Sequence, residues 1–271
     1  MSTPSLPPPL SADLAALLDQ VAERQRGDFG HMVSDVKVDG TLITACDRWS
    51  DQTLVEGLAR LYPGEGVLSE EGQQSVPRSA AYWVVDPLDG TTNFAAGIPY
   101  WAISLARFEQ GRPVLAVLDV PPLRQRIVAA AGQGAWRNGK RLDPPSRQSH
   151  PAGCASLCSR SIGVLQKLPQ QRFPGKIRML GVASLNLVSV AMGQTVAALE
   201  ATPKIWDLAA AWLVLTELGC SLHWLAASPE AIAPGTDLAS ADFPLLAADQ
   251  PSTLERFMPW GQALLTRSPD V

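Results

Sequence analysis

Residues 82–94 read YWVVDPLDGTTNF, in which an apolar run is followed by two aspartates, a glycine and two threonines. The run at 82–85 is typical of a short buried strand. Asp86 and Asp89 leave the end of that strand three positions apart, so their carboxylates can converge on one cation. Pro87 restricts the turn between them, and Gly90 lets the backbone approach a ligand closely.

A helix that begins near Gly90 would present unpaired backbone N–H groups, which suit a phosphate group. Taken alone, however, DPLDG at 86–90 is also an ordinary acidic turn, because Asp-Gly is common turn chemistry. The choice between these interpretations depends on the other acidic positions of the chain.

Four further acidic residues follow predicted strands or begin a predicted helix. Glu70 and Glu71 come directly after the short apolar strand at 67–69, and Asp47 follows the run at 42–44. Asp207 begins an apolar helix predicted at 207–218. Each has an ordinary explanation by itself, as a solvated loop or a helix cap. An acidic pair at a strand end is nevertheless stabilised when a cation is present.

Together these positions supply carboxylate oxygens without histidine or thiolate. The three histidines, His31, His150 and His223, lie outside the acidic clusters, and the four cysteines match no zinc spacing. Oxygen ligands favour magnesium or manganese over zinc or copper. Several carboxylates can hold two ions a few ångströms apart, which suits in-line attack on phosphorus.

The stretch at 83–94 resembles the metal-binding signature of the inositol monophosphatase family. TACD at 44–47, LSEEG at 68–72 and WDLAA at 206–210 resemble its other recurring blocks. They come in the family's order over residues 37–219, and four ordered blocks are far more specific than one. The resemblance implies an α/β (α+β) fold, a layered αβαβα sandwich of the inositol monophosphatase / fructose-1,6-bisphosphatase type. It also implies metal-dependent hydrolysis of a small phosphorylated polyol or sugar, without a covalent phosphoenzyme.

The resemblance assigns metal ligands position by position. Glu70, Asp86 and the backbone carbonyl of Leu88 would hold the first Mg²⁺. Asp86, Asp89 and Asp207 would hold the second, with Asp86 bridging the two ions. A third, weaker ion would use Glu70 and waters, so two to three Mg²⁺ ions are expected, with Mn²⁺ as an alternative.

The resemblance also implies catalytic and substrate-binding roles. Thr91 and Asp47 would orient and activate the attacking water on the first metal, beside Glu70. Glu200, seven positions before Asp207, matches an acid that binds a substrate hydroxyl. The full set expected at the substrate is Asp89, Gly90, Thr91, Thr92, Ala183, Glu200 and Asp207.

The second half departs from the family pattern in ways that concern the substrate side. Val196 stands where members often carry an aspartate, and Leu218-Gly219-Cys220 replaces the usual Ala-Gly-Gly. GAWRNGK at 134–140 has the glycine and lysine spacing of a P-loop. Arg141, however, stands where Ser or Thr must bind magnesium. Asn138-Gly139 instead predicts a two-residue hairpin turn.

Periodicity and turn residues predict one domain over 1–271 with two lobes, about 11–145 and about 150–271, and the resemblance implies that it is a phosphatase domain. A flexible proline-rich tail at 1–10 precedes a helix capped by Ser11 and stopped at Gly27. A second helix is expected at 50–61. Strands are expected at 101–108, 114–120 and 126–130, then a polar connection at 143–153. A helix at 183–192 and a strand at 196–201 follow.

Composition excludes several classes of protein. Of 271 residues, 46% are hydrophobic and 18% charged, with a formal net charge of −4. Without a basic stripe, nucleic-acid binding is not expected. No apolar run is long enough to cross a membrane, and the first residues resemble no secretory signal, so a cytoplasmic location is expected. The family resemblance implies lithium sensitivity and a homodimer.

Inositol 1-phosphate is the expected substrate, because residues 89–94 resemble the inositol branch, whereas a lysine often follows the first threonine in the histidinol-phosphate branch. The alternatives within the fold are fructose 1,6-bisphosphate, histidinol phosphate and 3′-phosphoadenosine nucleotides. A non-catalytic regulatory binding protein of this fold is a further alternative. Such a protein should lack at least one metal ligand, and every matching position is present.

Overall fold

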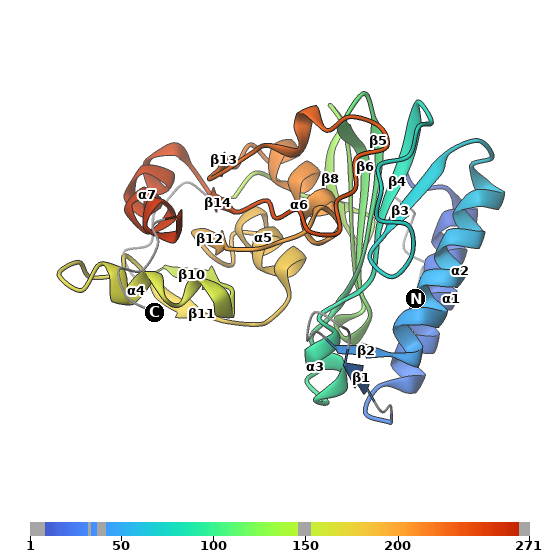
Figure 1. Ribbon diagram of the computed structural model, residues 1–271, viewed down its shortest axis with the longest axis horizontal. Coiled ribbons are helices and arrows are strands. Elements are labelled where there is room, and N and C mark those ends of the chain that lie inside the picture. The colour runs from blue at the N-terminus through green and yellow to red at the C-terminus, as the bar shows by residue number, and fades with distance from the viewer. Residues whose placement is uncertain (1–8, 32–33, 37–41, 146–152, 266–271) are drawn as a thin grey trace.

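The computed structural model describes residues 9–31, 34–36, 42–145 and 153–265, and it shows helical and sheet layers that alternate across the molecule (Figure 1). From one side to the other, the layers are a helix pair, a seven-stranded sheet, a second helix pair, a five-stranded sheet and outer helices. The expected αβαβα sandwich is therefore confirmed. The expected tail at 1–10 lies outside the described residues except for its last two positions.

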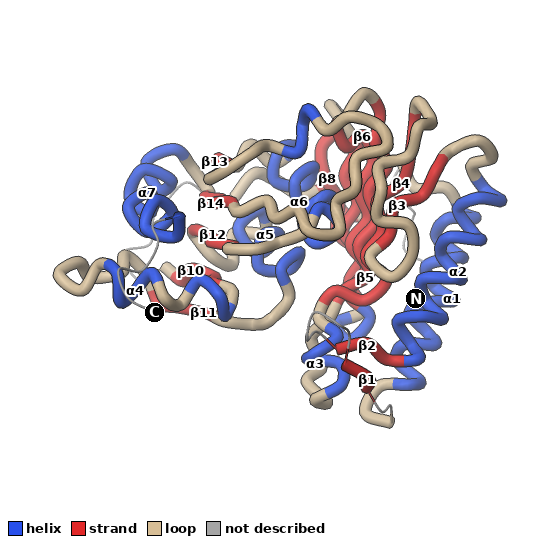
Figure 2. The backbone as a smooth tube through the Cα atoms, in the orientation of Figure 1, coloured by secondary structure: helices blue, strands red, loops and turns tan. Residues whose placement is uncertain are grey.

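The larger sheet has the strand order β3-β4-β5-β6-β7-β8-β9, with β3 parallel to β4 and the other pairs antiparallel. Figure 2 shows α1 (Ala12–Asp28) and α2 (Ala45–Leu61) along its outer face. Its strands are β3 (Gly66–Ser69), β4 (Ala81–Asp89), β5 (Ala102–Glu109), β6 (Arg112–Val120), β7 (Gln125–Ala130), β8 (Gly134–Arg137) and β9 (Lys140–Arg141).

Strand β4 is buried on both faces because each face meets a helix layer. Trp83 and Val85 belong to the apolar cluster with α1 and α2, whereas Val84 belongs to the cluster with the helices between the sheets. Side chains alternate sides along a strand, so a run that is apolar at every position suits this central place. The strand thereby carries its terminal aspartates into the interior.

The helices between the sheets, α5 (Ala183–Ala191) and α6 (Ile205–Glu217), are apolar around most of their circumference. A helix of this kind must be covered on all sides. Their side chains share one cluster with strands of both sheets, so the largest core joins the two predicted lobes.

The smaller sheet has the order β11-β10-β12-β14-β13, and α7 (Pro251–Leu265) and the short α4 (Val164–Lys167) pack on its outer face. A two-stranded sheet and α3 (Thr91–Ala95) lie near the end of β4. The remaining strands are β1 (Ser34–Val36), β2 (Leu42–Thr44), β10 (Cys154–Leu157), β11 (Lys176–Arg178), β12 (Ala197–Glu200), β13 (Ser221–Trp224) and β14 (Leu245–Ala248).

Most predicted elements are confirmed, with corrections at several ends. Helix α6 begins at Ile205 rather than Asp207. Helix α1 starts after Ser11, whose Oγ accepts from Leu14 N at 3.2 Å, but it continues through Gly27 to Asp28. Helix α2 begins at Ala45 rather than Ser50, because Thr44 and Asp47 form a capping box there. Strand β4 extends to Asp89 rather than Val85 through an irregularity in its pairing with β5.

The expected hairpin at Asn138-Gly139 is confirmed between β8 and β9, and no P-loop forms there. The connection predicted at 143–153 lies largely outside the described residues. Two contacts between the halves are well defined. Val76 N donates to Thr236 O at 2.9 Å, and the side chain of Glu217 accepts from Gly132 N and Gly134 N at 2.8 and 2.7 Å.

Candidate metal centre

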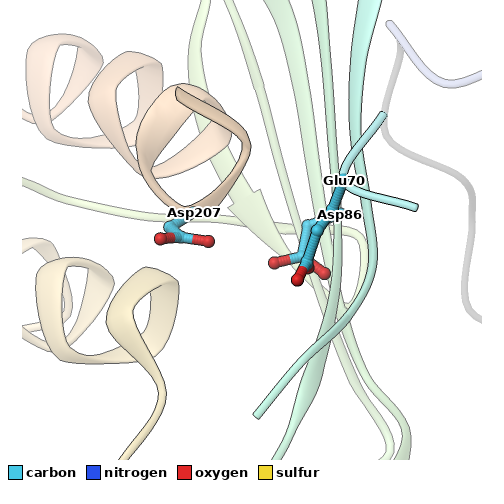
Figure 3. Close-up of side chains that lie close together, drawn as sticks. All are labelled: Glu70, Asp86 and Asp207. Atoms are coloured by element: carbon cyan, nitrogen blue, oxygen red, sulfur yellow. The ribbon is translucent and has the colours of Figure 1, made fainter. Parts of the chain in front are cut away.

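Three carboxylates converge between the larger sheet and the start of α6. Glu70, Asp86 and Asp207 each offer an oxygen, and these oxygens lie within 4.8 Å of one another. Figure 3 shows Glu70 and Asp86 projecting side by side toward Asp207. Residues 70, 86 and 207 are thus brought together from three separate sequence blocks.

Strand pairing explains how two of these acids meet. Strands β3 and β4 are parallel neighbours with Ser69 opposite Val85, so Glu70 and Asp86 follow at the same sheet edge. Glu70 N donates to Val85 O at 3.1 Å. Asp207 lies at the third position of α6, where its Oδ2 accepts from Lys204 N at 2.8 Å. Asp207 therefore caps its helix and also faces the acidic pair.

The electrostatics of this cluster suit a cation. Burial raises the pKa of Asp86 well above its usual range, and repulsion from Glu70, Asp89 and Asp207 raises it further. Burial and the neighbouring acids raise the pKa of Asp207 in the same direction. Among the described residues, the buried Oδ2 of Asp86 has no hydrogen-bond partner. A divalent cation would satisfy that oxygen and remove the repulsion, so these residues fit a hard metal ion.

Asp89 lies beside this trio but outside its tight cluster. Its Oδ2 accepts from Ser184 N at 2.7 Å, which ties the end of β4 to the start of α5. Burial raises the pKa of Asp89 to about 6, although the hydrogen bonds from Ser184 oppose the shift. The side chain lines two neighbouring cavities, so it can serve both a metal and a substrate.

A hydroxyl–carboxylate pair is formed by Thr91, which lines the same cavity as the acidic trio, and Asp47 behind it. Thr91 Oγ1 donates to Asp47 Oδ1 at 2.7 Å and lies 3.2 Å from the carbonyl oxygen of Leu88. Asp47 Oδ2 accepts from Thr44 N at 2.8 Å, so the capping box of α2 orients the carboxylate. Asp47 is 1% exposed, so its carboxylate is fixed by the surrounding packing. Its Oδ1 is thereby held in position to accept from the Thr91 hydroxyl.

Close packing fixes the backbone at Gly90. Its φ is +104°, and an added Cβ would come within 2.8 Å of Val182 Cγ2 and 3.3 Å of Trp101 Cβ. The first hydrogen bond of α3 runs from Phe94 N to Gly90 O, so the N–H groups of Gly90 and Thr91 precede the helical ladder. Only glycine combines this φ with so close an approach.

Two adjoining cavities make up the site. The first, of about 170 Å³, is lined by the acidic trio, Leu88, Asp89, Gly90, Thr91 and Thr92. The second, of about 190 Å³, is lined by Ala183, Asn186, Glu200, Cys158 and Arg160, among others. Asp89, Gly181 and Asp207 line both, so one molecule can extend from the first cavity into the second.

Glu200 is an acidic group that lines the second cavity but not the first. It is 2% exposed, and its Oε1 accepts from Asn186 Nδ2 at 2.8 Å. Burial raises the pKa of Glu200 to about 8, and the hydrogen bond from Asn186 opposes that shift. Its carboxyl is therefore largely protonated near neutral pH.

Sequence reasoning missed several residues that shape the site. Gln25 on α1 is fully buried, and its Nε2 donates to Pro87 O at 2.7 Å while its Oε1 accepts from Trp101 Nε1 at 3.0 Å. Asn186 and Arg160 also went unrecognised. A glutamine on the apolar side of the predicted helix was a usable signal for Gln25; neither Asn186 nor Arg160 stands in a motif.

Comparisons with known proteins show which family this chain resembles along its length. The model of the inositol monophosphatase family matches residues 10–255. This match extends beyond the recognised blocks at 37–219 on both sides, so residues 10–36 and 220–255 are also family sequence.

Two curated relatives and one solved structure illustrate the likeness. Histidinol-phosphatase of Mycobacterium tuberculosis is 36% identical over 217 residues, covering 75% of this chain and 83% of the relative. Nus factor SuhB of Pseudomonas aeruginosa is 35% identical, and the match covers 65% of this chain and 70% of the relative. The structure of an IMPase from Thermotoga maritima superposes with a TM-score of 0.76 at 25% identity, covering 92% and 94% of the two chains.

Proposed function

The chain belongs to the inositol monophosphatase family, and from that premise we propose that it hydrolyses a small phosphorylated polyol or sugar in a Mg²⁺-dependent reaction. The family is named for inositol monophosphatase, and the relative from Mycobacterium tuberculosis is a histidinol-phosphatase, so both act on phosphate monoesters. The observation that carries the Mg²⁺ dependence is the convergence of Glu70, Asp86 and Asp207 around a buried, unpartnered carboxylate oxygen.

In this proposal the metal ligands are Glu70, Asp86, Asp89, Asp207 and the carbonyl oxygen of Leu88. Two to three Mg²⁺ ions are expected, and Mn²⁺ also suits an oxygen-only set. Bound Mg²⁺ would lower the pKa of a coordinated water and offset charge on the phosphoryl and leaving oxygens. The ligands are present in full, which favours an enzyme over a non-catalytic binding protein.

The chain's own groups would orient the water and the phosphate. Thr91 accepts a hydrogen bond from the attacking water while its hydroxyl donates to Asp47, so a proton can pass to the Asp47 carboxylate. Glu70, which lines the same cavity as Thr91, would help to hold that water. The N–H groups of Gly90 and Thr91 bind the phosphate oxygens, and the Thr92 hydroxyl lies at the same cavity wall.

The second cavity would hold the alcohol part of the substrate. Asp89, Ala183, Glu200 and Asp207 line it, and their polar groups suit several hydroxyls. A carboxyl such as that of Glu200 can accept from, or donate to, a hydroxyl depending on its protonation. Since Asp89, Asn186 and Glu200 place polar groups in its wall, a polyol or sugar fits better than a wholly apolar ester.

Inositol 1-phosphate remains the substrate that residues 89–94 favour. Histidinol phosphate is the second candidate, because a histidinol-phosphatase is 36% identical over most of its length. Fructose 1,6-bisphosphate and 3′-phosphoadenosine nucleotides complete the set. The metal centre acts on the phosphate in all of them, so the second cavity determines the choice.

Assembly and location are part of the proposal. Ile98, Met179 and Leu180 are 49%, 42% and 41% exposed, and Asn93 links their segments by donating to Leu180 O at 2.8 Å. Adjacent exposed apolar side chains support the expected homodimer. No helix of the described chain has the length and apolar character of a membrane span. Four free cysteines support the proposed cytoplasmic location, and lithium inhibition is expected.

The first test is phosphate release from the four substrates with Mg²⁺ and with EDTA. Mg²⁺-dependent turnover that favours inositol 1-phosphate would support both the reaction and the substrate. Preference for another member would keep the reaction and replace the substrate. Absence of release from all four, with metal bound, would contradict the proposal and favour the non-catalytic alternative.

A further inference from the structure

Arg160 lies at the wall of the second cavity, at the centre of the 3₁₀ turn Ser159–Ser161 that follows β10. Its side chain is exposed, but its Nη1 donates to Thr202 Oγ1 at 2.7 Å. Thr202 lines the same cavity. The hydrogen bond therefore holds the guanidinium at the cavity rather than leaving it free in solvent.

Arg160 is the one cationic side chain among the described residues that line either cavity, beside five acids. The acids of the first cavity are occupied by metal ions in the proposed reaction. Within the described part of the chain, Arg160 forms no ion pair with any of these acids. Its donors that do not reach Thr202 remain available to a bound molecule.

Three ionisable side chains line the second cavity but not the first: Cys158, Arg160 and Glu200. Burial raises the pKa of the Cys158 thiol, so this group adds no charge. Glu200 is buried behind Asn186 and largely protonated near neutral pH, as its raised pKa of about 8 indicates. Arg160 is always charged. The far end of the substrate site is thus positive, although the near end consists of carboxylates.

We infer that Arg160 determines specificity by favouring phosphate monoesters that carry a second anionic group, remote from the scissile phosphate. The inference rests on the proposed function and specifies the substrate class of that same site. A second phosphate or a carboxylate accepts from the guanidinium in a charge-assisted pair. A neutral polyol gains only an ordinary hydrogen bond there, and a cationic substrate is repelled.

The contact lies away from the reacting atoms, so it acts on substrate binding. Binding the substrate and the transition state equally lowers KM without changing kcat. Loss of Arg160 should therefore raise KM for a doubly anionic substrate and leave the chemical step intact.

The test compares fructose 1,6-bisphosphate, inositol 1-phosphate and histidinol phosphate as substrates of the Mg²⁺-loaded wild type and Arg160→Gln. With fructose 1,6-bisphosphate, Arg160→Gln should raise KM about tenfold with kcat nearly unchanged. With inositol 1-phosphate, kcat/KM should stay within about twofold, and histidinol phosphate should improve. Arg160→Lys keeps the charge, so it should retain much of the preference for the bisphosphate.

Two further variants locate the effect. Thr202→Val removes the partner of the guanidinium, so it should raise KM for fructose 1,6-bisphosphate by a smaller factor, about threefold. Arg112→Gln is the control, because Arg112 is an exposed arginine that pairs with Glu230 and lines neither cavity. This control should match the wild type on all three substrates.

Equal losses on all substrates in Arg160→Gln would overturn the inference, as would an unchanged KM for the bisphosphate. A wild type that hydrolyses inositol 1-phosphate but neither hydrolyses nor is inhibited by fructose 1,6-bisphosphate would also overturn it, while the proposed function would stand. A wild type that releases phosphate from none of the substrates contradicts the proposed function itself.

Discussion

Asp89 connects the two cavities through a single carboxylate, because it lines both and is held by Ser184 N. Asparagine has nearly the same shape and can keep the hydrogen bond from Ser184, but it carries no charge. Asp89→Asn should therefore fold normally and lose activity on the order of 100-fold, through weakened metal binding. Turnover titrated with Mg²⁺ measures the shift.

A matched control for this change is Asp249→Asn. Asp249 is also buried, at 5% exposure, but it follows β14 and lines neither cavity of the site. Near-normal turnover of Asp89→Asn at limiting Mg²⁺ would exclude Asp89 as a ligand.

Gly90 is constrained by its neighbours as well as by its backbone angle. Gly90→Ala should lose about 3 kcal/mol of stability, of which roughly 1–2 kcal/mol comes from the left-handed backbone and the rest from contact with Val182. Gly97→Ala separates the two effects. Gly97 has φ +75° and open space around its would-be Cβ, so only the backbone penalty applies.

Urea denaturation of both glycine variants measures the difference between them. If Gly90→Ala is no less stable than Gly97→Ala, contact with Val182 does not contribute to the loss of unfolding free energy. In that case the requirement for glycine at position 90 comes from the backbone alone.

At the scale of elements, helix α1 contacts the turn between Asp86 and Asp89 through a hydrogen bond from Gln25. Gln25 receives the Trp101 indole N–H and donates to the Pro87 carbonyl in a fully buried setting. Gln25→Leu keeps the volume but leaves both groups unpaired, so it should reduce stability by about 3 kcal/mol. The apparent affinity for Mg²⁺ should also fall, because the turn would lose its support.

Gln52→Leu provides the comparison for Gln25→Leu, because Gln52 lies on the exposed side of α2 and its Nε2 donates to Glu56 Oε1 at 2.9 Å. Stability by urea unfolding and Mg²⁺ titration of turnover give the two readouts. Loss of stability with unchanged Mg²⁺ dependence would show that α1 supports the fold but not the metal turn.

In the molecule as a whole, the effect of metal binding on folding stability should depend on pH. In the metal-free protein, burial and repulsion raise the pKa values of Asp86 and Asp207, and burial raises that of Asp89 to about 6. These values lie above those of the unfolded chain, so the metal-free fold binds more protons and loses stability as the pH rises through them. Mg²⁺ should remove that penalty.

The gain in Tm from saturating Mg²⁺ over EDTA should therefore increase from about pH 5 to about pH 8. Thermal unfolding at constant ionic strength measures it. In Asp86→Asn the gain should be small at every pH. A gain that is independent of pH in the wild type would contradict the coupling of these acids to the metal.

The largest core joins strands of both sheets to α5 and α6, and it leaves no apolar boundary between the predicted lobes. We therefore propose that the chain unfolds as one cooperative domain. Tryptophan fluorescence and far-ultraviolet circular dichroism should give coincident urea transitions in metal-free buffer. Two separated transitions would instead support independent lobes at about 11–145 and about 150–271.

The sequence alone determined the family, the layered fold and the acidic positions, because ligand blocks are local. Asp86, Asp89 and Gly90 lie in one turn. The apolar run before them indicates a central strand. Element ends were less predictable: β4 continues past Val85 because Asp89 still pairs with Ala102 on its neighbour. Nothing local to residues 82–85 encodes that pairing.

Only the tertiary structure decided which distant side chains meet. Gln25 reaches Pro87 across 62 positions, and Asp207 faces Asp86 because α6 is packed between the two sheets. The charge of the second cavity also depends on packing, since burial raises the pKa of Glu200 to about 8 and Thr202 accepts a hydrogen bond from Arg160. Burial and long-range contact arise from the assembled core, so no local pattern in the chain contains them.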